Sequence, residues 1–208
     1  MDDAVFDDGK GSGARARAAK SAVDLYVQRG QQPPGDLLAL AYPDDLPIPE
    51  TAMVSGGYRE ALNSIRDRAY LMGERYAAQQ LRADREGVNM HLLGFVDAFQ
   101  RQLRALGVPM FCAEFHRDAE RQEKLFAAGM SKALPGQSAH GYGLAVDIVH
   151  SKLGWSMTRQ QWTLLGHIGK SVAARGRMKI DWGGDWEDPY DPAHWQVRGW
   201  RLLVPHAS

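Results

Sequence analysis

Two polar side chains in the middle of the chain have the types and spacing expected of metal ligands. His140 lies in the glycine-rich stretch SAHGYG, and Asp147 follows it inside an apolar run. Small residues around a histidine allow backbone and substrate to approach closely. An unpaired carboxylate is costly to bury in an apolar strand, and metal ligation would offset that cost. We therefore take His140 and Asp147 as candidate ligands.

A second pair near the C-terminus, Asp191 and His194, could complete such a site. Catalytic zinc usually takes three protein ligands from His, Asp or Glu and leaves one position for water. Zinc lowers the pKa of that water from ~15.7 to about 7, and a neighbouring carboxylate can take the proton during attack. This division of labour makes His194 the third ligand and Asp191 the general base.

The elements that must position these residues follow from the spacing of apolar residues. Helices are expected over 59–86 and 89–106, with Gly107 as a stop for the second. Asp118 and Thr158 are candidate N-caps of two later helices, which end near residues 129 and 175. Strands are expected over 108–115, 144–149 and 194–197, with a Trp- and Gly-rich loop before the last strand. Helices packed on a small, mostly antiparallel sheet form an α+β fold.

The composition excludes several classes of protein. The chain has 208 residues, of which 44% are hydrophobic, and its 25 basic and 25 acidic residues give a formal net charge of zero. Without a dense Lys/Arg stripe, a nucleic-acid binder is not expected. The longest apolar stretches are far shorter than the ~18 residues of a membrane span. The single cysteine, Cys112, rules out an internal disulfide and fits a reducing compartment.

The chain is expected to divide into two regions. Residues 1–89 form an N-terminal extension that is loop-rich and then helical, with a short helix over 14–29. Residues 90–208 form the catalytic domain. The first residues, MDDAVFDD, are acidic where a secretory signal would be basic. The sequence therefore predicts a product made in the cytoplasm without a signal peptide.

The order of these motifs resembles that of the M15 zinc peptidases. The pattern SxHxxGxAxD spans residues 138–147, and WGGDW at 182–186 is followed by DxxH at 191–194. The family includes D-alanyl-D-alanine carboxypeptidases, dipeptidases and the L-alanyl-D-glutamate endopeptidases of phage endolysins. WGGDW, with Asp and not Glu at position 191, resembles the endopeptidase branch most. The resemblance implies the family's α+β fold, Zn²⁺ held by His140, Asp147 and His194, and Asp191 as the catalytic base.

Arg117 and Gln122 match the family's Arg-x-x-x-x-Gln pattern. In such enzymes the arginine lies at the active site, where it can stabilise a developing oxyanion or hold a substrate carboxylate. Phe115 and His116 replace the small residue and the aromatic that usually precede this arginine. The residues expected to contact substrate are Ser138, Gln122, Tyr142 and Trp186. For Ser138 a turn-capping role is an equal alternative, and for Tyr142 so is simple packing; for Trp186, packing around the small sheet is the commoner role.

These observations predict a zinc-dependent peptidase that cuts the stem peptides of bacterial peptidoglycan, most simply between L-alanine and D-glutamate. Two alternatives stay open. One is a D-Ala-D-Ala carboxypeptidase or dipeptidase on the same zinc site, and the other is a non-catalytic wall-binding or virion structural protein on the same fold. The lack of a signal predicts phage-type delivery to the wall, by release at lysis or on a virion. Residues 1–89 would then contact the wall, or virion or tail proteins.

Overall fold

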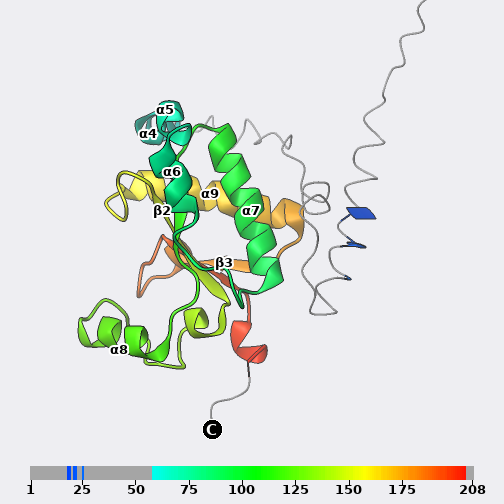
Figure 1. Ribbon diagram of the computed structural model, residues 1–208, viewed down its shortest axis with the longest axis vertical. Coiled ribbons are helices and arrows are strands. Elements are labelled where there is room, and N and C mark those ends of the chain that lie inside the picture. Colours follow the sequence, from blue (N-terminus) through cyan, green and yellow to red (C-terminus); the bar gives the residue numbers. More distant parts are fainter. Residues whose placement is uncertain (1–17, 20, 23–24, 26–57, 205–208) are drawn as a thin grey trace, which may run out of the picture. The chain divides into compact units, whose positions relative to one another are not determined.

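The computed structural model describes residues 18–19, 21–22, 25 and 58–204, drawn in colour in Figure 1. The chain divides into two compact units, Met1–Leu46 and Pro47–Ser208. The described residues of the first unit are helical, and the rest of the helix expected over 14–29 lies outside the described residues. Among the described residues, no helix combines the length and the apolar character that crossing a bilayer requires.

The second unit combines helices with a four-stranded antiparallel sheet, so the predicted α+β fold is confirmed (Figure 1). The helices are α4 (Tyr58–Ile65), α5 (Arg68–Leu71), α6 (Glu74–Gln80), α7 (Met90–Ala105), α8 (Ala119–Ala127) and α9 (Arg159–Gly176). The strands are β1 (Met110–Glu114), β2 (Ala145–His150), β3 (Ile180–Trp182) and β4 (His194–Val197). Three short 3-10 helices are η1 (Ala139–Tyr142), η2 (Gly183–Asp185) and η3 (Trp200–Leu202).

The register of the sheet determines which side chains share a face. The strand order is β1-β2-β4-β3, and in the central pair Asp147 lies opposite His194 while Val146 lies opposite Trp195. Directly opposed residues of an antiparallel pair project from the same face, and successive residues alternate. Asp147 and His194 therefore project from one face, and Val146 and Trp195 from the other.

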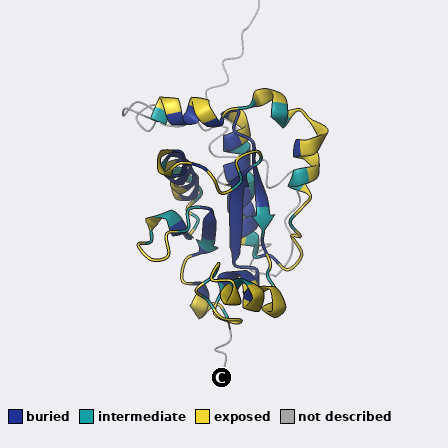
Figure 2. Cartoon of the chain, turned by 90° about the vertical axis from the view of Figure 1, so that its left-hand side faces the viewer, coloured by how far each residue is buried: buried dark blue, intermediate teal, exposed yellow. Residues whose placement is uncertain are grey.

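Helices α7 and α9 cover the face that carries Trp195. The ring of Trp195 lies 5.1 Å from the rings of both Phe95 and Phe99 of α7, and 5.7 Å from Trp182 of β3. All four aromatic side chains are buried, and Figure 2 shows the continuous buried layer that the sheet and these helices form. The hydrophobic effect thus fixes one face of the sheet and leaves the other for polar groups.

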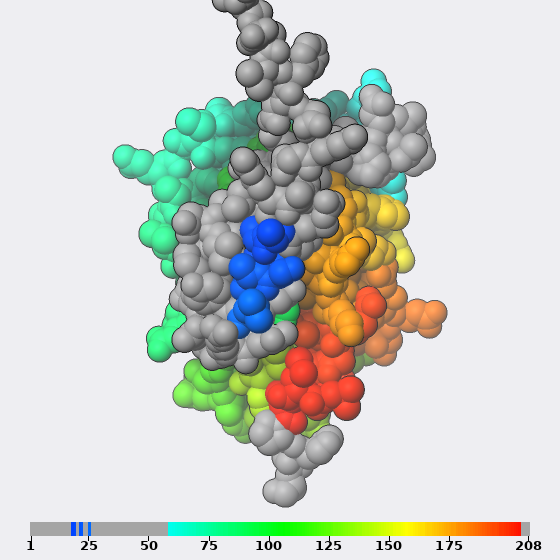
Figure 3. Space-filling view, turned by 90° about the vertical axis from the view of Figure 1, so that its right-hand side faces the viewer, coloured from blue at the N-terminus to red at the C-terminus, as the bar shows by residue number. Residues whose placement is uncertain are grey.

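Two glycines allow α9 to approach the sheet closely. A Cβ atom at Gly166 would lie 2.2 Å from the ring of Trp182, and one at Gly169 would lie 2.2 Å from the ring of Trp195. Gly166 and Gly169 are three residues apart, close to one helical turn, so they form a slot on a single side of α9. Another side of α9 bears exposed polar residues, and part of the helix is visible in orange at the surface in Figure 3.

Most elements agree with the sequence predictions, and two do not. The helix over 89–106, the strands and the N-caps at Asp118 and Thr158 are confirmed. The single helix expected over 59–86 is wrong, because the segment forms α4, α5 and α6, with Asp67 capping α5 and Gly73 starting α6. The Trp- and Gly-rich stretch expected to be a loop begins with the short strand β3.

Helices α4 to α6 belong to the same unit as the sheet and pack against its other elements. α4 contacts α9, and α6 contacts β1. The hydroxyl of Tyr76 in α6 donates to the carbonyl of Met110 at 3.2 Å, and the ring of His150 is hydrogen-bonded to the carbonyl of Ile65 at 3.0 Å. Residues 58–80 therefore support the outer strand of the sheet, while the function of the extension as a whole stays a prediction.

The slot in α9 leads to a stability prediction. Overpacking a close-packed core costs about 1–3 kcal/mol. Alanine also gains about 1 kcal/mol over glycine in helix propensity, so a second Gly→Ala variant in α9 is the proper reference. Gly176→Ala is this reference, because its new Cβ would meet only the side chain of Met178, which is flexible and can move aside. In urea unfolding, Gly169→Ala should be less stable than Gly176→Ala by roughly 1–3 kcal/mol. Equal stability would contradict the close packing of Trp195.

Candidate metal centre

Three elements bring His140, Asp147 and His194 together. Asp147 and His194 come from the paired strands β2 and β4, and His140 comes from η1 just before β2. The hydroxyl of Ser138 accepts from the backbone N–H of His140 at 3.4 Å and caps η1. Gly143 ends η1 with a left-handed conformation at φ +65°, and a Cβ there would lie 2.5 Å from the carbonyl oxygen of Gly87. The turn that aims His140 at the strands therefore requires glycine at its end.

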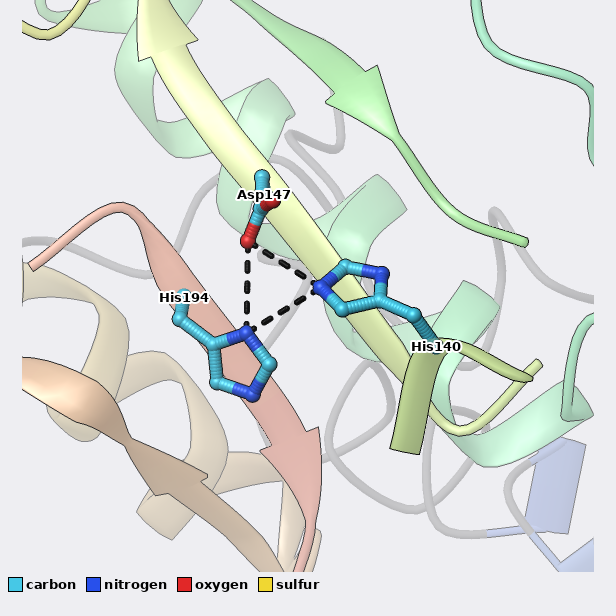
Figure 4. Close-up of side chains that lie close together, drawn as sticks. All are labelled: His140, Asp147 and His194. Atoms are coloured by element: carbon cyan, nitrogen blue, oxygen red, sulfur yellow. Dashed lines mark hydrogen bonds and ion pairs between the residues drawn. The ribbon is translucent and has the colours of Figure 1, made fainter. Parts of the chain in front are cut away.

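One atom from each of these side chains points to a common centre (Figure 4). The distances from His140 Nε2 to Asp147 Oδ1, from His140 Nε2 to His194 Nδ1, and from His194 Nδ1 to Asp147 Oδ1 are all 3.2 Å. All three residues are buried, and among the described residues they are the group of His, Cys, Asp and Glu arranged to hold a metal ion.

In each imidazole, the outer nitrogen, which points away from the cluster, is hydrogen-bonded to an oxygen atom. His140 Nδ1 lies 2.7 Å from the carbonyl oxygen of Phe115, which can only accept, so Nδ1 carries the proton. His194 Nε2 lies 3.1 Å from Oε1 of Gln196, which likewise accepts. In the neutral rings the inner nitrogens then have free lone pairs facing a carboxylate oxygen. Three acceptors that face one another in a buried place need a cation between them.

The spacing of the three atoms fits zinc. In a tetrahedral site with bonds of about 2.0–2.1 Å, the ligand atoms lie roughly 3.3–3.4 Å from one another. The 3.2 Å separations found here are close to that spacing. Two imidazoles and one carboxylate are also a donor set typical of catalytic zinc, which keeps its fourth position for water.

Arg117 lies beside this cluster and is held from three sides. Its Nη2 lies 3.3 Å from Oδ2 of Asp147, the carboxylate oxygen turned away from the cluster. Its Nε donates to Glu114 at 2.6 Å, and its Nη1 donates to Oε1 of Gln122 at 3.1 Å. Arg121 also donates to Glu114, at 2.5 Å. Only 10% of the Arg117 side chain is exposed, so its guanidinium is fixed against the carboxylate of Asp147.

The charges of these groups shift their pKa values in opposite directions. Burial alone would raise the pKa of Asp147, but when both imidazoles are protonated their charge and hydrogen bonds hold it well below the usual value. Burial alone would lower the pKa of His194, but hydrogen bonding and the charge of Asp147 raise it. The carboxylate of Asp147 is therefore ionised, as ligation of a cation requires.

Asp191 lies next to the cluster, on the loop that leads into β4. Burial raises the pKa of its carboxyl group, and the negative charge of Asp147 raises it further. The loop closes tightly, because a Cβ at Gly183 would lie 2.3 Å from the carbonyl oxygen of Asp191. The ring of Trp186, on the same loop, lies 5.2 Å from the ring of His194. The second carboxylate and an indole thus border the metal centre.

The other residues expected to contact substrate lie around the site with partners of their own. Gln122 is buried, and its amide nitrogen donates to the hydroxyl of Ser131 at 2.8 Å and to the carbonyl of Ala133 at 2.6 Å. The hydroxyl of Tyr142 donates to the carbonyl of Gly136 at 3.0 Å. Ser138 caps η1. Direct substrate contacts by these residues stay predictions.

A shallow hollow of about 380 Å³ adjoins η1 through Tyr142. Its other lining residues are Asp84, Glu86, Gly87 and His116. His116 is exposed and directly precedes Arg117, so the departure from the family pattern at position 116 places an imidazole beside the site and outside the metal cluster.

Two residues with clear structural roles at the site were missing from the sequence predictions. Glu114 holds Arg117, and Gln196 holds His194. Gln196 could have been found, because residues two apart on a strand share a face. Glu114 could not, because it faces Asp147 through a register shift between Cys112 and Glu114 that no sequence pattern indicates.

Comparisons with known proteins point to one family. A model of the M15 peptidases, described as D-alanyl-D-alanine carboxypeptidase, matches residues 132–197. The peptidoglycan L-alanyl-D-glutamate endopeptidase CwlK of Bacillus subtilis (strain 168) is 26% identical over 119 residues, which cover 49% of this chain and 68% of the relative.

Two solved structures are also similar. The L-Ala D-Glu endopeptidase ChiX of Serratia marcescens is 26% identical, with a TM-score of 0.49, and the match covers 63% of this chain and 92% of that one. The D,D-pentapeptidase VanY of a VanB-type vancomycin resistance cassette, a mutant solved with Zn(II), is 19% identical, with a TM-score of 0.40. That match covers 54% of this chain and 73% of VanY.

The matched residues 132–197 include the three side chains that converge at the metal centre, together with Asp191. The predicted ligands therefore lie where the family similarity is found and where the geometry fits a zinc ion. Over these residues the chain is similar to the M15 family of zinc peptidases.

Proposed function

We propose that this enzyme hydrolyses the amide bond between L-alanine and D-glutamate in the stem peptides of bacterial peptidoglycan. The observation that supports it most is the convergence of His140, Asp147 and His194, with the partly buried carboxylate of Asp191 near enough to interact with them electrostatically. CwlK and ChiX, which are named as endopeptidases for this bond, are each 26% identical to the chain. Peptidoglycan is therefore the proposed substrate.

Each residue of the centre has a distinct task in this proposal. Zinc held by His140, Asp147 and His194 would polarise the scissile carbonyl and supply a water that is acidic near neutral pH. Asp191 takes the proton from the attacking water and passes it to the leaving amine. Burial and the charge of Asp147 raise the pKa of Asp191, which brings it closer to the working pH of a general base.

Arg117 acts mainly through Asp147 in this scheme. Its donors are occupied by Glu114, Gln122 and Asp147, so it does not need the substrate to hold its position. A guanidinium fixed against one oxygen of Asp147 leaves the other oxygen, Oδ1, for the metal. Its positive charge also favours the oxyanion that forms when water attacks the carbonyl.

A second candidate is a D-Ala-D-Ala carboxypeptidase on the same metal centre. The matching family model favours this candidate, because the model is described as D-alanyl-D-alanine carboxypeptidase. The proposed biological setting is lysis of the wall by a phage-type enzyme, released at lysis or carried on a virion. Residues 1–89 would contact the wall or virion and tail proteins. This setting rests on the resemblance to the endolysin branch.

The bond that is cut identifies the activity. Purified protein should release fragments with a new N-terminal D-glutamate from peptidoglycan, and a chelator should abolish their release, because the attacking water depends on the metal. Mass spectrometry of the digest measures the new termini. Free D-alanine in place of those fragments would support the carboxypeptidase. No hydrolysis of either bond by the zinc-loaded protein would contradict both candidates.

Asp191 is tested by a variant that keeps its shape. Asp191→Asn should bind zinc like the parent but lose about 10²–10⁴-fold in kcat, the usual contribution of a general base. Asp185→Asn is the control, because Asp185, the last residue of η2, is exposed and is paired with Lys170 at 2.7 Å. An Asp191→Asn variant that digests peptidoglycan at the parent's rate would exclude Asp191 as the base.

The ligand set is tested by metal content. His194→Ala should lose most of its zinc after dialysis, while the parent should retain about one ion per chain, because three protein ligands are the usual minimum for a catalytic site. The matched control is His167→Ala on α9, whose exposed ring packs against Tyr58 at 5.4 Å. Metal analysis by mass spectrometry measures the result. Unchanged zinc in His194→Ala would remove this residue from the set.

A further inference from the structure

Beyond the proposed reaction, the geometry assigns a positioning role to Gln196, which we infer fixes the ring of His194 in its metal-binding orientation and thereby sets the affinity for zinc. This inference rests on the ligand set of the proposed function. Gln196 lies two residues beyond His194 on β4, so both side chains project from the same face of the sheet. Its Oε1 atom lies 3.1 Å from His194 Nε2.

His194 needs such a partner more than His140 does. His140 is oriented by a backbone carbonyl, that of Phe115, and is 2% exposed. The only polar partner of His194 Nε2 among the described residues is the side chain of Gln196. A half-turn of the His194 ring about its Cβ–Cγ bond would place a carbon where Nδ1 now faces the cluster. It would also place a carbon against Gln196 and lose the hydrogen bond.

The hydrogen bond also selects the tautomer of His194. When Oε1 of Gln196 accepts from Nε2, the proton of the neutral ring resides on Nε2 and the lone pair resides on Nδ1. Nδ1 is the nitrogen that lies 3.2 Å from both Asp147 Oδ1 and His140 Nε2. Gln196 therefore favours the one ring orientation and the one tautomer that can bind a cation at this centre.

The surroundings of Gln196 explain why an amide suits this position. On β3 its cross-strand partner is Asp181, and on β2 its partner is Ala145. Asp181 is ion-paired with Arg198 at 2.6 Å. A carboxylate at position 196 would lie opposite Asp181, and like charges directly opposite each other destabilise a sheet. An amide accepts from His194 without that repulsion.

The inference is tested by the dissociation constant of zinc, measured by competition with a chromophoric chelator. Gln196→Leu keeps the approximate size of the side chain and removes the acceptor, so zinc should bind about 10–100-fold more weakly. Gln196→Glu restores an acceptor at the same place, so its zinc affinity should remain near that of the parent, with a lower stability because of Asp181. The control is Gln100→Leu, a buried glutamine on α7 whose amide contacts the sulfur of Cys112 at 3.3 Å.

The outcomes separate this inference from the proposed function. Weaker zinc binding in Gln196→Leu, with parent-like binding in Gln196→Glu and Gln100→Leu, supports the role of Gln196 even if no peptidoglycan is cut. Parent-like zinc binding in Gln196→Leu overturns the inference, and so does a Gln196→Glu variant as weak as Gln196→Leu. Peptidoglycan hydrolysis by the parent can be intact in either case. If the leucine variant does not fold, by circular dichroism, Gln196→Ala replaces it, with the same expected loss of zinc affinity and the same overturning result.

Discussion

Three acceptor atoms that face one another 3.2 Å apart in a buried place are the constraint around which this enzyme is built. Two imidazole nitrogens and a carboxylate oxygen repel one another unless a proton or a cation lies between them. The fold supplies the rigidity that keeps them together. The register of β2 and β4 places Asp147 opposite His194, and the capped turn η1 brings His140 to the same point.

The rigidity comes from the other face of the sheet. Along β4, His194 and Gln196 project toward the metal centre, while Trp195 and Val197 project into the helical layer. The ring of Trp195 is held by Phe95 and Phe99 and by the slot at Gly169. A close-packed interior transmits strain. A substitution at Gly169 would therefore displace Trp195, which directly follows His194 in the chain. The apolar layer and the metal centre are therefore two sides of the same strand.

The sequence was informative wherever function depends on short motifs. His140, Asp147 and His194 stand in local patterns, and their convergence could be predicted, as could the local caps at Asp118 and Thr158; the role of Asp191 stays a prediction. Features that depend on tertiary contacts could not be predicted. β3 is too short to show a periodicity, and it is a strand because it pairs with β4. Over 59–86, helical spacing continues through Asp67 and Gly73, where the backbone turns to follow the underlying surface.

The charges around the centre indicate the charge of the ion that belongs there. Asp147, Glu114 and Asp191 contribute three carboxylates, and Arg117 is the cation enclosed among them, since Arg121 is largely exposed. With both histidines neutral, the centre has an excess of two negative charges. Burial raises the pKa of Asp191, and the negative charge of Asp147 raises it further, as expected near an excess of negative charge. A divalent cation would neutralise this excess and keep Asp191 in its ionised form, whereas a monovalent ion would compensate only half of it.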